Sequence, residues 1–413
     1  MNRPFDLIVF GATGFTGRLV AEYLNRTCGA GGELAWAMAG RNLDKLAAVR
    51  SSIGAGEALP LIAAEASDAD SLAGLARQSR AIITTVGPYQ RYGRALVSAC
   101  VQAGTDYVDL CGEPAWMARM IPLLEAPARD SGARIVFSCG FDSIPFDLGV
   151  VFVQDEARRR FGQPLTRVHC GVRKMKGKPS GGTIASMLAT LEQMGRDPAV
   201  ARTMADPFAL TPGFRGPRQP ASGAAAYDEL AKSWTAPFVM APVNTKNVHR
   251  SNALLGRPWG EDFVYDERML AGDGAEGEQR ARRMASALRF QNAMLAFAPT
   301  RALLRRFALP KPGEGPGAEE REAGGYELLF IGQAADGRTL RASVRGEGDP
   351  GYASSSRMIS ESALCLIEDV DRAQTGGGVW TPGAAMGLKL IPRLQVRAGL
   401  TFSIEDQSNG SSG

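Results

Sequence analysis

The sequence predicts an α/β protein built on a doubly wound parallel sheet, followed by a second α+β substrate domain. Three observations support this class. Short apolar runs alternate with amphipathic segments over the first 150 residues, the connections between them are short, and a glycine-rich turn follows the first run. Such alternation is typical of βαβ units, in which helices cover both faces of a parallel sheet.

Six strands are expected in this first sheet, at residues 5–10, 34–39, 59–64, 81–86, 107–110 and 134–138. The intervening helices are expected at residues 16–26, 43–51, 69–78, 93–103 and 115–124, with one more at 147–160. Connections of a few residues are normal in such units, so one sheet accommodates all six strands.

Beyond this sheet the pattern changes. We expect three parts in the chain: the dinucleotide-binding domain at 1–150, the substrate domain at 151–372 and a C-terminal part at 373–405. A strand is expected at 165–173, a helix at 183–194, an exposed loop at 310–325 and a helix at 352–367. Asp336-Gly337 predicts a hairpin between strands 326–332 and 339–346. A last helix at 384–397 is expected to return to the first domain, whereas residues 195–260 show no assignable pattern.

A phosphate-binding turn is predicted between the first strand and the first helix. There the glycines allow the backbone to approach a diphosphate, and the helix N-terminus favours the anion. The expected contacts are Gly11, Thr13, Gly14, Phe15, Thr16 and Gly17. A tight strand-to-helix connection without a ligand is the alternative. In its strand–helix context, the spacing indicates a Rossmann dinucleotide-binding domain.

The coenzyme expected in this domain is NADPH. The second strand ends at Arg41, where an enzyme that uses NAD would offer a carboxylate to the ribose. Arg41 and Lys45 suit a 2′-phosphate, although a solvated surface arginine is the alternative. After the third strand, Asp68 is expected to contact the adenine or to cap the next helix, and the two roles are compatible.

The turn after the fourth strand is expected to lie along the nicotinamide ribose, because ligands bind at the carboxyl ends of strands in open α/β sheets. Its residues are Thr85, Val86, Gly87 and Pro88.

Several longer motifs resemble those of the saccharopine dehydrogenase-like oxidoreductases, and in particular of their trans-acting enoyl reductase branch. They are FGATGFTG at 10–17, AGR at 39–41, TVGPY at 85–89, YVDLCGE at 107–113, CGFDSIPFDLG at 139–149, PGEGP at 312–316 and TPGAAMG at 381–387. The resemblance covers nearly the whole chain. One departure is Phe146, where a small residue is the family pattern, and this difference could alter the pocket.

The resemblance implies an NADPH-dependent reductase that reduces a carbon–carbon double bond of an enoyl lipid or polyketide intermediate, in trans to a synthase. One alternative is a saccharopine-type dehydrogenase of an imine or amino acid, for which Arg173 could bind a carboxylate. Another is a non-catalytic NADPH-binding scaffold at a membrane.

Three residues are candidates for the catalytic groups that an enoyl reduction needs. Tyr89 could donate the proton, or its ring could pack over the nicotinamide. Asp142 and Ser143 could bind the substrate carbonyl, or cap the helix that starts near Pro145. Glu113 could line the same face, although the following proline favours a helix-capping role. Cys139 shows no partner base, so a nucleophilic role is not favoured.

Composition excludes several classes of function. A net charge of +4 gives no basis for nucleic-acid binding, and six cysteines without a C-x-x-C pair beside two histidines give none for a metal site. No secretory signal and no run of about 20 apolar residues is evident, so a cytoplasmic protein is expected. The sequence does not decide between a monomer and a homodimer.

One segment suggests a partner surface. Residues 279–309 contain seven arginines and no acid, interleaved with apolar residues. Such a basic amphipathic segment could lie on an anionic membrane or meet an acyl carrier of a polyketide synthase. The alternative is a pair of core-packed helices, broken at Pro299, with arginines on the solvated side.

Overall fold

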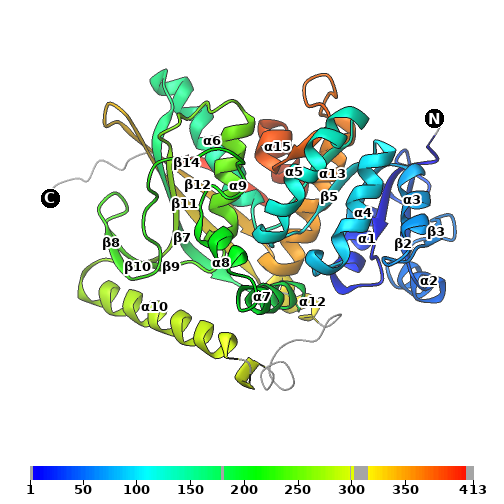
Figure 1. Ribbon diagram of the computed structural model, residues 1–413, viewed down its shortest axis with the longest axis horizontal. Helices are drawn as coiled ribbons and strands as arrows, with labels where there is room; N and C mark the ends of the chain where they lie inside the picture. Colours follow the sequence, from blue (N-terminus) through cyan, green and yellow to red (C-terminus); the bar gives the residue numbers. More distant parts are fainter. Residues whose placement is uncertain (1–2, 178–180, 298, 302–314, 406–413) are drawn as a thin grey trace.

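The computed structural model describes residues 3–177, 181–297, 299–301 and 315–405. Two sheets organise this part of the chain, and helices pack around and between them (Figure 1). Each sheet has seven strands among the described residues. We call the sheet that contains the N-terminal strands sheet A and the other sheet B.

Sheet A is the predicted parallel sheet, with strand order β13-β6-β5-β4-β1-β2-β3. Its strands are β1 (Phe5–Phe10), β2 (Trp36–Gly40), β3 (Leu61–Ala63), β4 (Ser79–Thr84), β5 (Asp106–Asp109), β6 (Arg134–Val136) and β13 (Gly378–Trp380). The helices that connect them are α1 (Phe15–Cys28), α2 (Leu43–Ser52), α3 (Ala69–Arg77), α4 (Tyr89–Ala103) and α5 (Pro114–Ser131), and α6 (Ile144–Phe161) follows β6. The doubly wound fold is thereby confirmed.

Helices cover sheet A on both faces, which explains why its central strands are continuous apolar runs. Leu7 and Val9 of β1 belong to one hydrophobic cluster, and Ile8 and Phe10 belong to another. Successive side chains of a strand point to opposite faces, so this alternation reports two separate cores. Helices α3 and α4 contribute to one core, and α1 contributes to the other.

Sheet B has the order β14-β12-β11-β7-β10-β9-β8. Its strands are β7 (Leu165–Lys176), β8 (Ala226–Asp228), β9 (Ser233–Pro237), β10 (Val264–Gly272), β11 (Gly325–Ala334), β12 (Thr339–Glu347) and β14 (Leu400–Glu405). Strand β7 runs parallel to β10, and the other neighbours are antiparallel. The predicted hairpin is present as β11–β12, with Gly337 at φ +87° in its turn.

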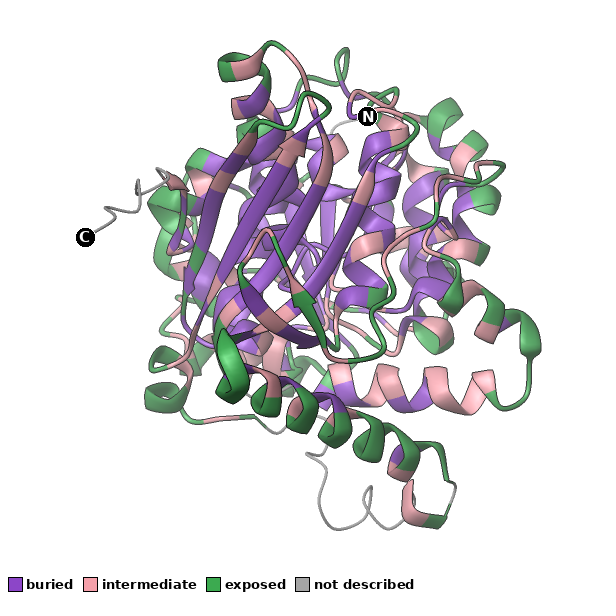
Figure 2. Cartoon of the chain, turned by 90° about the vertical axis from the view of Figure 1, so that its left-hand side faces the viewer, coloured by how far each residue is buried: buried purple, intermediate pink, exposed green. Residues whose placement is uncertain are grey.

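The helices of the remaining chain are α7 (Gly181–Met194), α8 (Pro198–Ala205), α9 (Ala241–Leu254), α10 (Gly274–Ala296), α12 (Ala318–Glu322), α13 (Ser355–Glu368), α14 (Pro382–Ala385) and α15 (Leu390–Arg397), with single turns η1 (Pro350–Ser354) and η2 (Gly387–Lys389). Figure 2 shows α10 lying along the outside of the molecule, with many exposed residues, near the largely buried strands of sheet B.

The segment 195–260 contains α8, β8, β9 and α9, none of which the sequence pattern indicated. The reason is clearest in α9, whose polar residues Asn244, Asn247 and Ser251 are fully buried. A helix that buries polar side chains shows no apolar stripe. The expected loop at 310–325 contains α12, while its residues 310–314 lie outside the described part of the chain.

The end of the chain divides between the two sheets, unlike the single returning helix expected at 373–405. Strand β13 joins sheet A beside β6, and β14 closes the edge of sheet B beside β12. Helix α13, assigned by sequence to the second domain, packs against α1, β4 and β5. The chain therefore crosses repeatedly between the two sheets, which holds them against each other.

Candidate active site

The turn after β1 contains two glycines that the protein's own packing requires. A Cβ atom on Gly11 would lie 2.6 Å from Cγ2 of Val86, and one on Gly17 would lie 2.1 Å from the carbonyl oxygen of Gly11. Gly11 also has φ +88°, which disfavours other residues. Only glycine at these two positions lets the turn close against the end of β4.

Gly14 is less closely surrounded by the described chain than these two glycines. A Cβ atom there would meet only the carbonyl oxygen of Gly11, at 3.3 Å. Gly14 precedes α1 without a side-chain cap, and the first N–H groups of a helix have no intrahelical acceptor. Thr13 and Gly14 are exposed, and Thr16 is partly buried, at the start of the same helix. This arrangement fits a diphosphate.

Phe15 contributes its backbone to this turn, while its ring faces the protein. The ring lies 4.6 Å from that of Tyr352, and a Cβ atom on Gly315 would lie 2.5 Å from it. The guanidinium of Arg321 lies 5.6 Å from the ring centre. Phe15 thus anchors the turn to the segment that precedes sheet B strand β11.

The residues expected at the adenosine end lie on the surface beside this turn. The side chain of Arg41 is 76% exposed, and its Nε is 4.0 Å from Oε2 of Glu65. Lys45 is exposed in the first turn of α2. Asp68 caps α3 by accepting the N–H groups of Asp70 and Ser71. Arg41 therefore keeps a guanidinium that can turn toward a ligand.

The turn after β4 reaches the phosphate-binding turn directly. The hydroxyl of Thr85 donates to the carbonyl of Gly11 at 3.4 Å. Val86 and Pro88 are partly buried and Gly87 is exposed. The two turns are adjacent, as a dinucleotide spanning both would require.

Tyr89 is bound within the protein and does not face an open space. Its hydroxyl donates to the carbonyl of Thr84 at 3.3 Å and accepts the N–H of Leu110 at 3.0 Å. Burial raises the pKa of the phenol well above its ordinary value. The hydroxyl joins the ends of β4 and β5, so the structure gives Tyr89 a structural position and not the one expected of a proton donor.

Glu113 caps a different helix from the one its sequence position suggested. Its carboxylate makes no cap bond to α5 but accepts the N–H groups of Tyr89 and Gln90 at the start of α4. It also accepts the hydroxyl of Ser186, on α7, at 2.6 Å. The carboxylate therefore links the end of β5 to a helix from the second half of the chain.

Asp142 lies in the turn after β6 with a free carboxyl group. Among the described residues, no hydrogen bond or ion pair involves that carboxyl. One of its oxygens would lie 3.1 Å from a Cβ atom on Gly112, in the turn after β5. Burial raises the pKa of Asp142 to about 7. The group is partly exposed, so it is a weak acid with access to the carboxyl edge of sheet A.

Ser143 is fixed beside Asp142 by a residue from the second half of the chain. Its hydroxyl donates to the carbonyl of Asp142 and accepts Nδ2 of Asn247, on α9, at 2.7 Å. Neither Asp142 nor Ser143 makes a side-chain cap to α6, which was their alternative role. The sequence did not indicate Asn247, because it lies 104 positions from its partner in an unassigned segment.

Phe146, the departure from the family pattern, lies in the core behind this turn. Its ring is 5.5 Å from that of Phe141 and 5.6 Å from that of Phe238, and the side chain is fully buried. The residue supports the Asp142 turn from behind.

Two residues raised by sequence have other roles in the structure. Arg173 binds Glu405 through both terminal nitrogens, at 2.5 and 2.8 Å, and also contacts Glu327. The arginine is thereby engaged and does not supply the carboxylate site of an amino-acid dehydrogenase. Cys139 is fully buried, and burial raises the pKa of its thiol well above the ordinary value.

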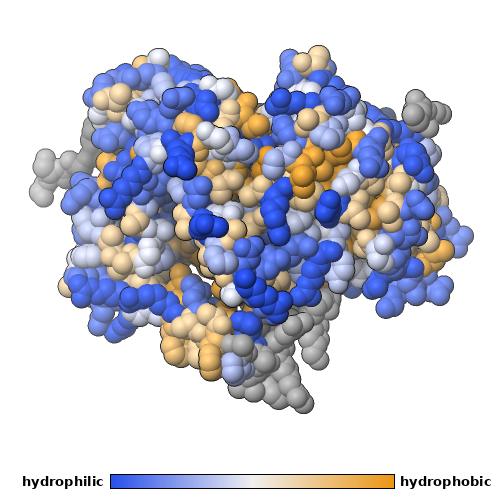
Figure 3. Space-filling view, in the orientation of Figure 1, coloured by the Kyte–Doolittle hydropathy of each residue, from blue (hydrophilic) through white to orange (hydrophobic). Residues whose placement is uncertain are grey.

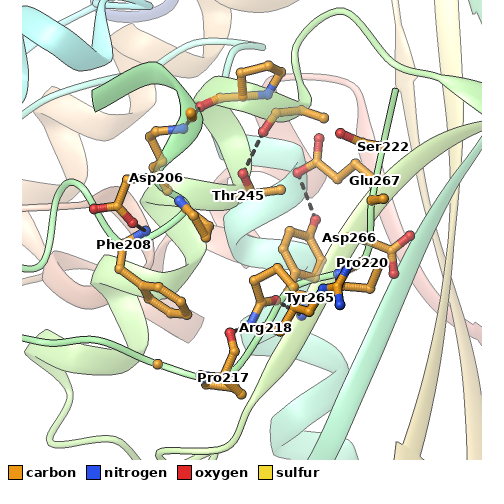
Figure 4. Close-up of a pocket in the computed structure, with 18 of the residues that line it drawn as sticks. Asp206, Phe208, Pro217, Arg218, Pro220, Ser222, Thr245, Tyr265, Asp266 and Glu267 are labelled. Atoms are coloured by element: carbon orange, nitrogen blue, oxygen red, sulfur yellow. Dashed lines mark hydrogen bonds between the residues drawn. The ribbon is translucent and has the colours of Figure 1, made fainter. Parts of the chain in front are cut away.

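A cavity of about 750 Å³ lies in the second half of the chain, on the other side of α9 (Figure 4). Lys246 of α9 lines it, and burial lowers the pKa of that lysine to about 8. Tyr265 and Glu267 of β10 line it too, 2.9 Å apart, and burial raises the pKa of Glu267 to about 8. The residue after Lys246 is Asn247, so one helix connects this cavity to the Asp142 turn.

The described residues show neither a metal cluster nor a membrane span. No group of three His, Cys, Asp or Glu side chains among them could hold a metal ion. No helix in the described ranges is long and apolar enough to cross a membrane.

Comparison with known proteins places this geometry among enzymes. Residues 7–136 match the saccharopine dehydrogenase NADP binding domain. A Mycobacterium tuberculosis protein, provisionally named a trans-acting enoyl reductase, is 42% identical over 419 residues, which cover 95% of this chain and 96% of that protein. The trans-acting enoyl reductase of Mycobacterium ulcerans is 37% identical over 408 residues, with the same two coverages.

Among solved structures, the saccharopine dehydrogenase (L-Glu forming) of Saccharomyces cerevisiae matches with a TM-score of 0.54 and 13% identity. The match covers 97% of this chain and 100% of that one. At this identity the match shows a shared fold alone.

Proposed function

Because the chain belongs to the saccharopine dehydrogenase-like oxidoreductases, in the branch of the trans-acting enoyl reductases, we propose that it reduces the carbon–carbon double bond of an enoyl intermediate. The chain is an NADP-dependent oxidoreductase, and the finer proposal concerns its substrate. That substrate is an enoyl thioester of a lipid or polyketide, presented by a synthase that lacks this activity. The names of the relatives support enoyl reduction in trans, and the lipid or polyketide nature of the substrate is part of the proposal.

The coenzyme in the proposal is NADPH, held across the two turns of sheet A. The N–H groups at the start of α1 bind the diphosphate, Arg41 and Lys45 bind the 2′-phosphate, and the turn at Thr85 lies along the nicotinamide ribose. The exposed guanidinium of Arg41 supports this assignment, because within the described ranges only a weak 4.0 Å contact with Glu65 competes for it. NADPH, when bound, supplies the hydride.

The proton in the proposal comes from Asp142. Hydride addition at the β-carbon moves the electron pair of the double bond toward the thioester carbonyl, and the α-carbon then takes a proton. An acid whose pKa is near the working pH suits this transfer. Asp142 has a pKa of about 7 and is partly exposed. Its carboxyl is also free of partners among the described residues, and this observation carries the proposal.

Asn247 and Ser143 position that acid. The amide of Asn247 holds the hydroxyl of Ser143, and the hydroxyl holds the backbone of Asp142. These two hydrogen bonds connect α9 to the Asp142 turn and orient it. Neither of them uses the carboxyl group of Asp142. Protonation of Asp142 after each turnover comes from solvent, since the side chain is partly exposed.

The test is NADPH oxidation, followed by absorbance, with a 2-enoyl thioester as substrate. We expect turnover with the wild type and a kcat reduced by about 100-fold or more in Asp142→Asn, because the amide has no acidic proton to give. The wild-type kcat should fall as the pH rises through 7, since the protonated carboxyl is the active form. Asp142→Asn should lose this pH dependence.

The control is Asp130→Asn, which makes the same chemical change at an exposed position on α5. It should keep the wild-type rate and pH profile. Wild-type activity with an α-amino acid and none with the enoyl thioester would refute the proposed reaction. An unchanged rate in Asp142→Asn would refute the assigned acid.

A further inference from the structure

Helix α10 presents apolar side chains to solvent on the side opposite its packed face. Phe290 of α10 is 69% exposed, and Phe297, the residue directly after the helix, is 61% exposed. Ala287, before Phe290, and Ala293, between the two phenylalanines, are exposed as well. Figure 3 shows apolar side chains gathered over the C-terminal half of α10 and hydrophilic ones over its N-terminal half. Exposed phenylalanines so close together are unusual on a soluble surface.

The buried residues of α10 that face sheet B are small, whereas Leu295 packs against Ile184 and Leu188 of α7. Gly277, Ala281 and Ala285 are buried, and the helix contacts β9 and β10. At 3.6 residues per turn, Phe290 lies five positions after Ala285 and so points away from that face. Phe290 therefore has no role in holding α10 on sheet B.

Arginines accompany the phenylalanines on the exposed side. Arg283 lies seven residues, or about two helical turns, before Phe290, so these two side chains form one stripe along α10, and Phe297 follows directly after the end of the helix. Arg289 is exposed beside it. Neither Arg283 nor Arg289 pairs with a carboxylate in the described ranges, and α10 has no acid after Glu278. Cations thus border the apolar stripe without counter-charges.

We propose that this face of α10 docks on an anionic lipid surface. The phenylalanines enter the boundary between headgroups and acyl chains, and the arginines pair with lipid phosphates. A lipid surface accepts a single straight helix, since it demands no shaped pocket on the protein. The charge on this face is complementary to anionic lipid along its length. Docking would leave the carboxyl edge of sheet A unchanged, so it is separate from the proposed reaction.

The experiment is cosedimentation of the full chain with vesicles of phosphatidylcholine, with and without phosphatidylglycerol. We expect binding only when phosphatidylglycerol is present, and weaker binding at high salt because exposed charges are screened. Phe290→Ser combined with Phe297→Ser should lower the partition coefficient by about tenfold or more, because the two rings that the membrane would bury are removed. Arg283→Glu combined with Arg289→Glu should have a similar effect.

The matched control is Leu123→Ser combined with Val396→Ser. These residues are 57% and 81% exposed, on α5 and α15, away from the stripe. The control should bind as the wild type does, and equal thermal unfolding of all variants should show that each is folded. No binding of the wild type to anionic vesicles would overturn the proposal. So would equal binding of the phenylalanine variant, or use of the stripe by an acidic acyl carrier protein in place of lipid.

Discussion

At the residue scale, chemistry depends on which polar groups the fold leaves unpaired. Glu113 and Tyr89 lie near the same strand ends as Asp142, yet both are committed to hydrogen bonds within the protein. Asp142 alone of these three keeps its side chain free among the described residues. Burial without a partner favours its neutral form, which is the form a proton donor needs.

In the proposal, single residues also decide which coenzyme binds, and two variants test their separate contributions. Arg41→Ala should weaken NADPH binding by about tenfold or more and leave NADH binding unchanged, because a charge-assisted contact to the 2′-phosphate is lost.

Gly14→Asp should remove binding of both coenzymes, because the new carboxylate would enter the diphosphate position. Fluorescence titration with each coenzyme measures both effects. Equal loss of NADPH and NADH in Arg41→Ala would exclude the assigned contact.

At the element scale, α9 connects the cavity in the second half of the chain to the Asp142 turn of sheet A, a link that the sequence pattern did not indicate. It lies between the 750 Å³ cavity and the Asp142 turn, and most of its length is buried. The central strands of sheet A were predictable because they are apolar on both faces. Helix α9 was not, because Asn244 and Asn247 find their partners in distant segments. Likewise, the three residues of β13 are too short a run to show a period.

Glu267, which lines the cavity beside α9, should make the free energy of unfolding depend on pH. Burial raises the pKa of Glu267 from an ordinary value of 4.5 to about 8. The folded protein therefore holds this proton more tightly than the unfolded chain does. The resulting stabilisation is complete below pH 4.5 and is lost as the pH rises through 8.

Glu267→Gln isolates this contribution. The free energy of unfolding of the wild type, relative to the variant, should fall by on the order of a few kcal/mol between pH 5 and pH 8. Urea titrations at both pH values measure it. Glu261→Gln, at an exposed position, serves as the control and should show no such difference. A constant difference between wild type and Glu267→Gln would mean that Glu267 is ionised in the folded protein.

At the scale of the whole molecule, the two sheets divide the work. Sheet A carries the turns proposed to bind the coenzyme and the Asp142 turn, while segments from the second half of the chain complete the same edge through Ser186, Asn247 and Tyr352. The glycine-rich turn after β1 was predictable because its residues are contiguous. The completing residues were not, since they arrive from three separate elements and bear no motif.

The most direct test of the account follows both hydrogens into the product. The wild type is given a 2-enoyl thioester with NADPH carrying deuterium at C4, or with unlabelled NADPH in heavy water, and the product is analysed by mass spectrometry and NMR. The account predicts coenzyme deuterium at the β-carbon and solvent deuterium at the α-carbon. A product without coenzyme deuterium, or an unreduced double bond while NADPH is consumed, would contradict it.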